Sequence, residues 1–106
     1  MEDEPTISTH VLDVETGRPA AGIVVHLMRA IGLDEVEEWY GTTDEDGRIR
    51  RLLEGPLLAG GYTITFRADG RFFHELSVTF EITDTSRSYH VPLLMAPYSL
   101  STYRGS

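Results

Sequence analysis

An all-β sandwich or barrel is the fold class that the sequence predicts, and two observations support it. Short stretches rich in β-branched and aromatic residues recur along the 106-residue chain, and Gly, Pro and Asp residues separate them. Several short strands at regular spacing, each bounded by turn residues, are typical of sandwiches and barrels. The expected strands lie near residues 7–14, 22–29, 36–43, 48–53, 61–67, 76–83, 87–95 and 98–104.

Turn signals fill most of the gaps between these strands. They lie at residues 15–19, 44–47, 54–56, 60–61 and 96–97. A helical turn remains open at residues 33–39 or 72–76, because a strand and one helical turn look alike at that length. No repeat, linker or low-complexity segment interrupts the pattern, so residues 1–106 are expected to form a single domain.

The first expected strand and the one near residues 87–95 each have two distinct faces. Period-two alternation gathers apolar residues on one face, namely Ile7 and Val11, and then Tyr89, Val91, Leu93 and Met95. The opposite faces are half apolar, and each carries one histidine, His10 or His90. A strand that is apolar on both faces is usually covered on both, and in a chain this small the second cover must be another subunit. We therefore expect oligomerisation through the histidine-bearing face.

Pro92 disturbs the second of these strands. Proline cannot donate a hydrogen bond to a neighbouring strand and avoids central strands. It therefore marks either a bulge or a position whose N–H would be unpaired, and the sequence does not decide between the two.

The charge composition limits the chemistry and the partners. There are 17 acidic residues and 9 basic ones, all of them arginine, which gives a net charge of −8. This charge repels phosphate backbones and anionic membranes, so neither nucleic acid nor a membrane is expected as a partner. The absence of lysine excludes a Schiff base, and the absence of cysteine excludes thiol nucleophiles, disulfides and thiolate metal sites. Chemistry must come from His, Arg, carboxylates, hydroxyls and Tyr.

The N-terminal segment, residues 1–5, is acidic where a secretory signal has a basic head and an apolar centre. No apolar run approaches the ~18 residues that a membrane-spanning helix requires. We therefore expect a cytoplasmic protein.

Several motifs, in the same order along the chain, resemble the transthyretin-related 5-hydroxyisourate hydrolases. The segment from Ile7 to Asp13, followed by Gly-Arg-Pro-Ala at residues 17–20, is similar to the opening of that family. Residues 43–48 resemble its central threonine and Asp-Gly-Arg turn, and residues 89–94 its Tyr-His-Val-Pro-Leu-Leu strand. The most specific motif is Tyr-Arg-Gly-Ser at residues 103–106, which the family carries as its last four residues. Each motif is weak alone, and the ordered set is strong.

The resemblance implies a fold, an assembly and an activity. The fold is a transthyretin-like β-sandwich of two four-stranded sheets, whose inter-strand helix is short or missing here because only about eight residues, 68–75, are available for it. The assembly is a homotetramer, a dimer of dimers with active sites in the central channel. The activity is hydrolysis of 5-hydroxyisourate, a lactam ring opening to 2-oxo-4-hydroxy-4-carboxy-5-ureidoimidazoline in urate degradation, a step of purine metabolism. Neither a metal nor another cofactor is expected.

The family's active-site positions fall on His10, Arg48, His90 and the tail from Tyr103 to Ser106. Histidine, with an ordinary pKa of roughly 6.5, suits water activation and proton delivery. Which of the two histidines is the base is open. The planar guanidinium of Arg48 suits orientation of the substrate ring and stabilisation of negative charge.

The tail is expected to complete the site. Tyr103 holds the substrate through its hydroxyl, and Ser106, with its free carboxylate, closes the site and positions the water or its histidine. For Arg104 two roles are open, substrate binding and anchoring of the chain end.

Simpler interpretations stand beside these. Without the resemblance, His10 and His90 are ordinary strand residues, Arg48 is a solvated turn residue, and the tail is frayed. His26 and His74 are interpreted as structural, and no third ligand at a useful spacing supports a metal site. Two other functions share the fold: a transthyretin-like carrier of a small ligand and a non-catalytic sandwich module. Neither requires histidines at positions 10 and 90 or the terminal motif.

Overall fold

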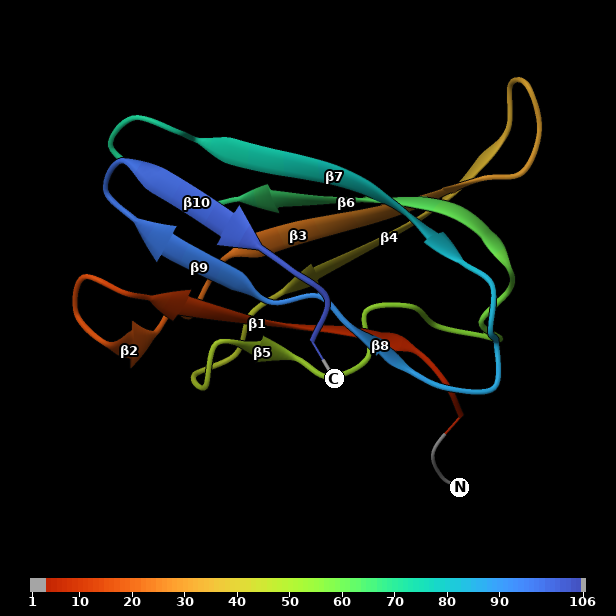
Figure 1. Ribbon diagram of the computed structural model, residues 1–106, viewed down its shortest axis with the longest axis horizontal. Coiled ribbons are helices and arrows are strands. Elements are labelled where there is room, and N and C mark those ends of the chain that lie inside the picture. Colours follow the sequence, from red (N-terminus) through yellow and green to blue (C-terminus); the bar gives the residue numbers. More distant parts are fainter. Residues whose placement is uncertain (1–3, 106) are drawn as a thin grey trace.

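The computed structural model describes residues 4–105 as two β-sheets (Figure 1). In chain order the strands are β1 (Ile7–Asp13), β2 (Arg18–Pro19), β3 (Val24–Ala30), β4 (Val36–Thr42), β5 (Arg48–Ile49), β6 (Gly60–Arg67), β7 (Glu75–Ile82), β8 (Tyr89–His90), β9 (Leu93–Ala96) and β10 (Ser99–Thr102). The described residues contain no helix. The sequence left a helical turn open at residues 33–39 and 72–76. The first segment is a loop that leads into β4, and the second is a loop that leads into β7.

The first sheet is organised around β1. Segments β8 and β9 pair with β1 in parallel, and β10 lies outside β9. The short segments β5 and β2 pair with β1 antiparallel along its other edge. Six strand segments thus occupy four positions, and β4, β3, β6 and β7 form the second, antiparallel sheet. The predicted sandwich of two four-stranded sheets is confirmed.

Pro92 lies between β8 and β9 without changing the register. Ile7 is opposite Tyr89 and Val11 is opposite Leu93, so four residues separate the pairs on both strands and no bulge is present. The N–H of Val91 donates to the carbonyl of Ser8 at 2.9 Å, and alternation turns the nitrogen of Pro92 away from β1. Of the two alternatives for Pro92, a position whose N–H would be unpaired is therefore correct, and a bulge is not.

The core fills the space between the sheets. Buried side chains of the first sheet include Ile7, Val11 and Leu93, and those of the second include Leu27 and Phe66. On β1, the residues that alternate with this core are half-buried on the outer face. The predicted two-faced character of this strand is confirmed.

The connection between β6 and β7 is a tight turn. The backbone N–H groups of Ala68 and Asp69 both donate to the carbonyl of His74, and that of Gly70 donates to the carbonyl of Phe73. No helix forms there, as the short spacing predicted. Residues 4–105 contain no helix that is long and apolar enough to span a membrane.

Candidate active site

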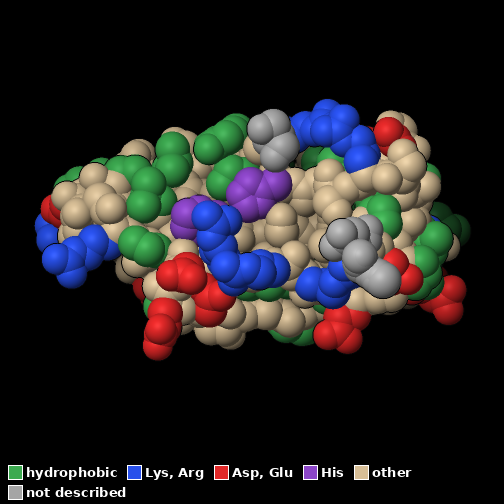
Figure 2. All heavy atoms as spheres, turned by 90° about the horizontal axis from the view of Figure 1, so that it is seen from below, with side chains coloured by type: hydrophobic (Ala, Val, Ile, Leu, Met, Phe, Trp, Pro, Cys, Tyr) green, Lys and Arg blue, Asp and Glu red, His purple; other side chains and the backbone are tan. Residues whose placement is uncertain are grey.

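Strand β1 brings together residues that are far apart in the sequence. His10 is opposite Arg48 on β5, and Ser8 is opposite His90 on β8. Paired residues of adjacent strands project to the same face, and Ser8 and His10 are two residues apart on one strand. The two histidines and the arginine therefore share the outer face of the first sheet. Figure 2 shows histidine side chains beside an arginine on the side of the molecule where β5 and β8 flank β1.

The turn before Arg48 is organised by one carboxylate. Oδ1 of Asp44 accepts hydrogen bonds from the backbone N–H groups of Asp46 and Arg48, both at 2.9 Å. Oδ2 of Asp44 accepts from Nη1 of Arg50 at 3.1 Å. The hydrogen bond from the Arg48 amide is the main cause that lowers the pKa of Asp44. The carboxylate therefore stays ionised and holds the turn that presents Arg48.

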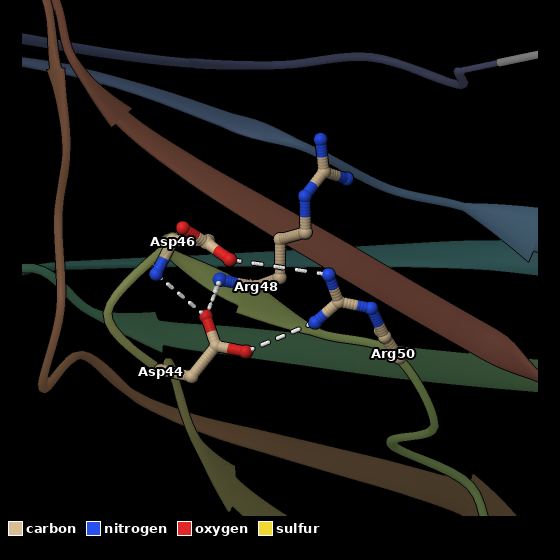
Figure 3. Close-up of polar contacts among 4 residues, drawn as sticks. All are labelled: Asp44, Asp46, Arg48 and Arg50. Carbon is tan, nitrogen blue, oxygen red and sulfur yellow. Dashed lines mark hydrogen bonds and ion pairs between the residues drawn. The ribbon is translucent and has the colours of Figure 1, made fainter.

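The side chain of Arg48 takes no part in this acidic cluster. Figure 3 shows it extending away from Asp44, Asp46 and Arg50 and across β1. It is half-buried, and within residues 4–105 it forms no ion pair. Arg50 forms the ion pairs with Asp44 and Asp46. The charge of Arg48 is therefore directed at the face that carries the histidines.

His90 is held on two sides. Its Nδ1 lies 2.9 Å from Oγ of Ser8. Gly105 lies against the ring so closely that a Cβ on this glycine would be 2.7 Å from Cδ2 of His90. Burial lowers the pKa of His90, and the proximity of Arg48 and His10 lowers it further. The imidazole is therefore neutral near pH 7, with one protonated and one unprotonated ring nitrogen.

The C-terminal segment is anchored, not frayed. The N–H of Gly105 donates to the carbonyl of His90 at 2.7 Å, and Oγ1 of Thr102 donates to the carbonyl of Pro92 at 2.7 Å. In Figure 1 the chain descends from β10 toward β8. Gly105 thus reaches the neighbourhood of His90, whereas Ser106 lies outside the described residues.

Tyr103 and Arg104 both line one cavity, but they make different contacts. If the β9–β10 register continues, Tyr103 comes opposite Pro92 on the outer face, where it is 54% exposed. The guanidinium carbon of Arg104 lies 5.0 Å from the ring centroid of Tyr89, a cation–π contact. These contacts support the anchoring role for Arg104, and a role in substrate binding stays a prediction.

A cavity of ≈210 Å³ lies beside this anchor. Its lining includes Val78, Phe80, Tyr89, Tyr103 and Arg104. Neither histidine of the outer face lines it, so the cavity meets the candidate site only at the C-terminal segment, through Tyr103 and Arg104. Among residues 4–105, no group of three or more histidine and carboxylate side chains is arranged to hold a metal ion.

Two contributors were not predicted from the sequence. Ser8 contacts His90, and the carboxylate of Asp44 organises the turn before Arg48. Alternation already placed Ser8 on the face of His10, but its pairing with a residue 82 positions later depends on the register. Asp44 belongs to the turn expected at residues 44–47, but its role as an acceptor depends on the turn's conformation.

Comparison with known proteins finds relatives of this chain in sequence and in structure. The model of the HIUase/Transthyretin family matches residues 7–105. The 5-hydroxyisourate hydrolase of Deinococcus radiodurans is 40% identical over 119 residues that cover 100% of each chain. The structure of Klebsiella pneumoniae 5-hydroxyisourate hydrolase is 35% identical, with a TM-score of 0.83 over 96% of this chain and 99% of that one.

Sea bream transthyretin, solved in complex with thyroxine, shares the fold with a TM-score of 0.81. It is 23% identical over 93% of each chain, so this likeness concerns the fold alone. The family match and the full-length relatives go further, and they show that the chain belongs to the HIUase/Transthyretin family.

Proposed function

We propose that this chain hydrolyses 5-hydroxyisourate, opening its lactam ring in the degradation of urate. Relatives that match over nearly their whole length bear the name 5-hydroxyisourate hydrolase. The observation that carries the proposal is the convergence of His10, Arg48 and His90 on one face, with His90 kept neutral. A carrier of a hydrophobic ligand has no need for two imidazoles and a guanidinium in this arrangement.

The chemistry requires a base for water, a donor for the developing oxyanion and a group that orients the ring. The histidine pair supplies the base, and general-base proton transfer typically contributes 10²–10⁴-fold to a rate. Arg48 supplies a planar donor for the carbonyl oxygen, and one such contact is worth about 3 kcal/mol in the transition state. Tyr103 and Ser106 are proposed to hold the substrate and to close the site.

We further propose that the active form is a homotetramer built from two dimers. The outer face of the first sheet carries half-buried apolar side chains, Leu12 and Leu94, beside the histidines. A second copy of the chain would cover these side chains and exclude bulk water from the site, which strengthens electrostatic contacts there. Each chain carries a net charge of −8, so whole assemblies repel one another and stay in aqueous solution. A cytoplasmic location completes the proposal.

The direct test is the ultraviolet absorbance of 5-hydroxyisourate, generated in place from urate, with and without the protein. The substrate also decays spontaneously, so the expected result is decay faster than this background. Substitution of His10, Arg48 or His90 by Gln should lower the rate at least about a hundredfold and leave the circular dichroism spectrum unchanged. Wild-type rates in all three variants would refute the assignment.

A matched control is His26→Gln. His26 also lies on a strand, but its Nε2 pairs with Oε1 of Glu38 at 2.8 Å on the other sheet. This variant should keep the wild-type rate. Deletion of residues 103–106 should impair hydrolysis, whereas a carrier or a non-catalytic module would tolerate it. If the wild-type protein does not accelerate decay, the hydrolase proposal fails and the carrier takes its place.

A further inference from the structure

Ser8 has a particular relation to His90. The two residues are paired between β1 and β8, and Oγ of Ser8 lies 2.9 Å from Nδ1 of His90. Among the described residues this is the only hydrogen bond of the Ser8 hydroxyl and the only one of the His90 ring. The pair is partly buried, and Gly105 closes off the Cδ2 side of the ring. Nε2 is therefore the ring nitrogen left for a substrate or a water molecule.

The direction of this hydrogen bond decides which nitrogen of the neutral ring carries the proton. A neutral imidazole has one donor and one acceptor nitrogen, whereas a serine hydroxyl is both donor and acceptor. If Nδ1 donated to Ser8, the hydroxyl proton would be left without an acceptor within the described residues. If Ser8 donates to Nδ1, that single bond satisfies both the hydroxyl proton and the lone pair of Nδ1. The second arrangement leaves fewer polar groups unpaired in a partly buried site.

We infer that Ser8 is a positioning residue, whose hydroxyl donates to Nδ1 of His90 and so holds this imidazole in the tautomer with its proton on Nε2. The inference rests on the proposed hydrolase function for its consequence, but the tautomer itself does not depend on catalysis. With a proton on Nε2, neutral His90 offers a hydrogen-bond donor and no lone pair. It therefore does not act as the base, and the role of base falls to His10.

The hydrolysis then proceeds with a complete proton balance. His10 takes a proton from water as the water oxygen bonds to the lactam carbonyl carbon. The Nε2–H group of His90 and the guanidinium of Arg48 donate hydrogen bonds to the oxygen that becomes negative. The C–N bond then breaks, and the leaving nitrogen takes the proton that His10 carries. His90 keeps its proton throughout, and Ser8 contacts neither the substrate nor the water.

The first test reads the tautomer without any substrate. Nitrogen-15 NMR correlation spectra of the uniformly labelled protein near pH 7.5 distinguish a protonated Nε2 from a protonated Nδ1 in each histidine, and His90→Gln assigns the signals. The expected result is a single Nε2–H tautomer for His90. In Ser8→Ala the signals should move toward the mixture of an unconstrained imidazole, and Ser8→Thr, which keeps the hydroxyl, should restore the wild-type pattern. A wild-type His90 with its proton on Nδ1 would overturn the inference.

The second test uses the kinetics of 5-hydroxyisourate decay. Ser8→Ala should lower kcat about tenfold, because a loosely held donor misses the oxyanion, and KM should change less than about twofold. Ser8→Thr should restore kcat. The control Ser77→Ala removes a strand serine on the other sheet, bonded to Oγ1 of Thr65 at 2.7 Å, and should leave both constants unchanged. A Ser8→Ala variant with wild-type kcat and tautomer refutes the positioning role, whereas an inactive wild-type protein with the expected tautomer refutes only the hydrolase proposal.

Discussion

Gly47, the residue before Arg48, offers a quantitative test of how the fold positions the site. Its φ is +74°, and a Cβ there would lie 2.5 Å from the carbonyl oxygen of Val11 and 3.1 Å from the nitrogen of Ala20. In Gly47→Ala the left-handed backbone costs about 1–2 kcal/mol. The overlap must also disturb two hydrogen bonds, from Val11 to Gly47 at 2.7 Å and from Ala20 to Val11 at 2.9 Å. At about 1 kcal/mol for each bond, the free energy of unfolding should fall by about 3–4 kcal/mol.

Gly17→Ala is the matched control for this substitution. Gly17 has nearly the same φ, +76°, but a Cβ there meets no atom within 4 Å. Its substitution should therefore cost only the backbone term, about 1–2 kcal/mol. Denaturant unfolding of both variants at one protein concentration measures the difference, because association shifts apparent stability. If the two variants lose equal stability, the close approach of Gly47 to β1 is not what holds this turn.

Two further predictions follow from the residues that join β1 to β8 and β9. The NMR titration midpoint of His90 should lie below 6.5 and should rise in Arg48→Gln, because a positive charge that disfavours protonation is removed. In the wild-type protein, His90 has a lower pKa in the folded chain than in the unfolded chain, so the unfolded chain binds the proton more tightly. The free energy of unfolding should therefore fall as the pH drops from 6.5 toward the titration midpoint of His90 in the folded protein. Thr9→Val removes the buried hydroxyl that donates to the carbonyl of Val91 at 2.6 Å, and it should lower the free energy of unfolding by about 1–3 kcal/mol in a denaturant titration.

The strands were predictable wherever one face is buried and the other is not. Alternation identified the core face of β1 because it meets the core and the outer surface in strict turn. It failed for residues 48–53, where only Arg48–Ile49 form a strand. Leu52 and Leu53 are fully apolar and buried, but a loop delivers them to the core, with the N–H of Leu52 bonded to the carbonyl of Ile7 at 2.9 Å. Burial alone therefore does not distinguish a strand from a loop that fills the core.

The candidate site was predictable in part from pattern and in part only from resemblance. Alternation placed His10 and His90 on non-core faces, and the structure has both on the outer face of one sheet. Nothing in the local sequence of Arg48 distinguishes it from a solvated residue after an Asp-Gly turn. Its direction depends on its pairing with His10, a contact between segments 38 positions apart that no local pattern contains.

The register that forms the site is fixed by the core. Tyr89, Val91 and Leu93 are buried, and they alternate with His90, which faces outward. A slip of one residue between β1 and this strand would turn the three apolar side chains outward and bury the imidazole, which the loss of apolar burial opposes strongly. A slip of two residues would keep the core pattern but move His90 from Ser8 to the position opposite His10 or Thr6. The hydrogen bond between Thr9 and the carbonyl of Val91 disfavours this second slip, so a buried threonine helps to decide which residue lies beside the imidazole of His90.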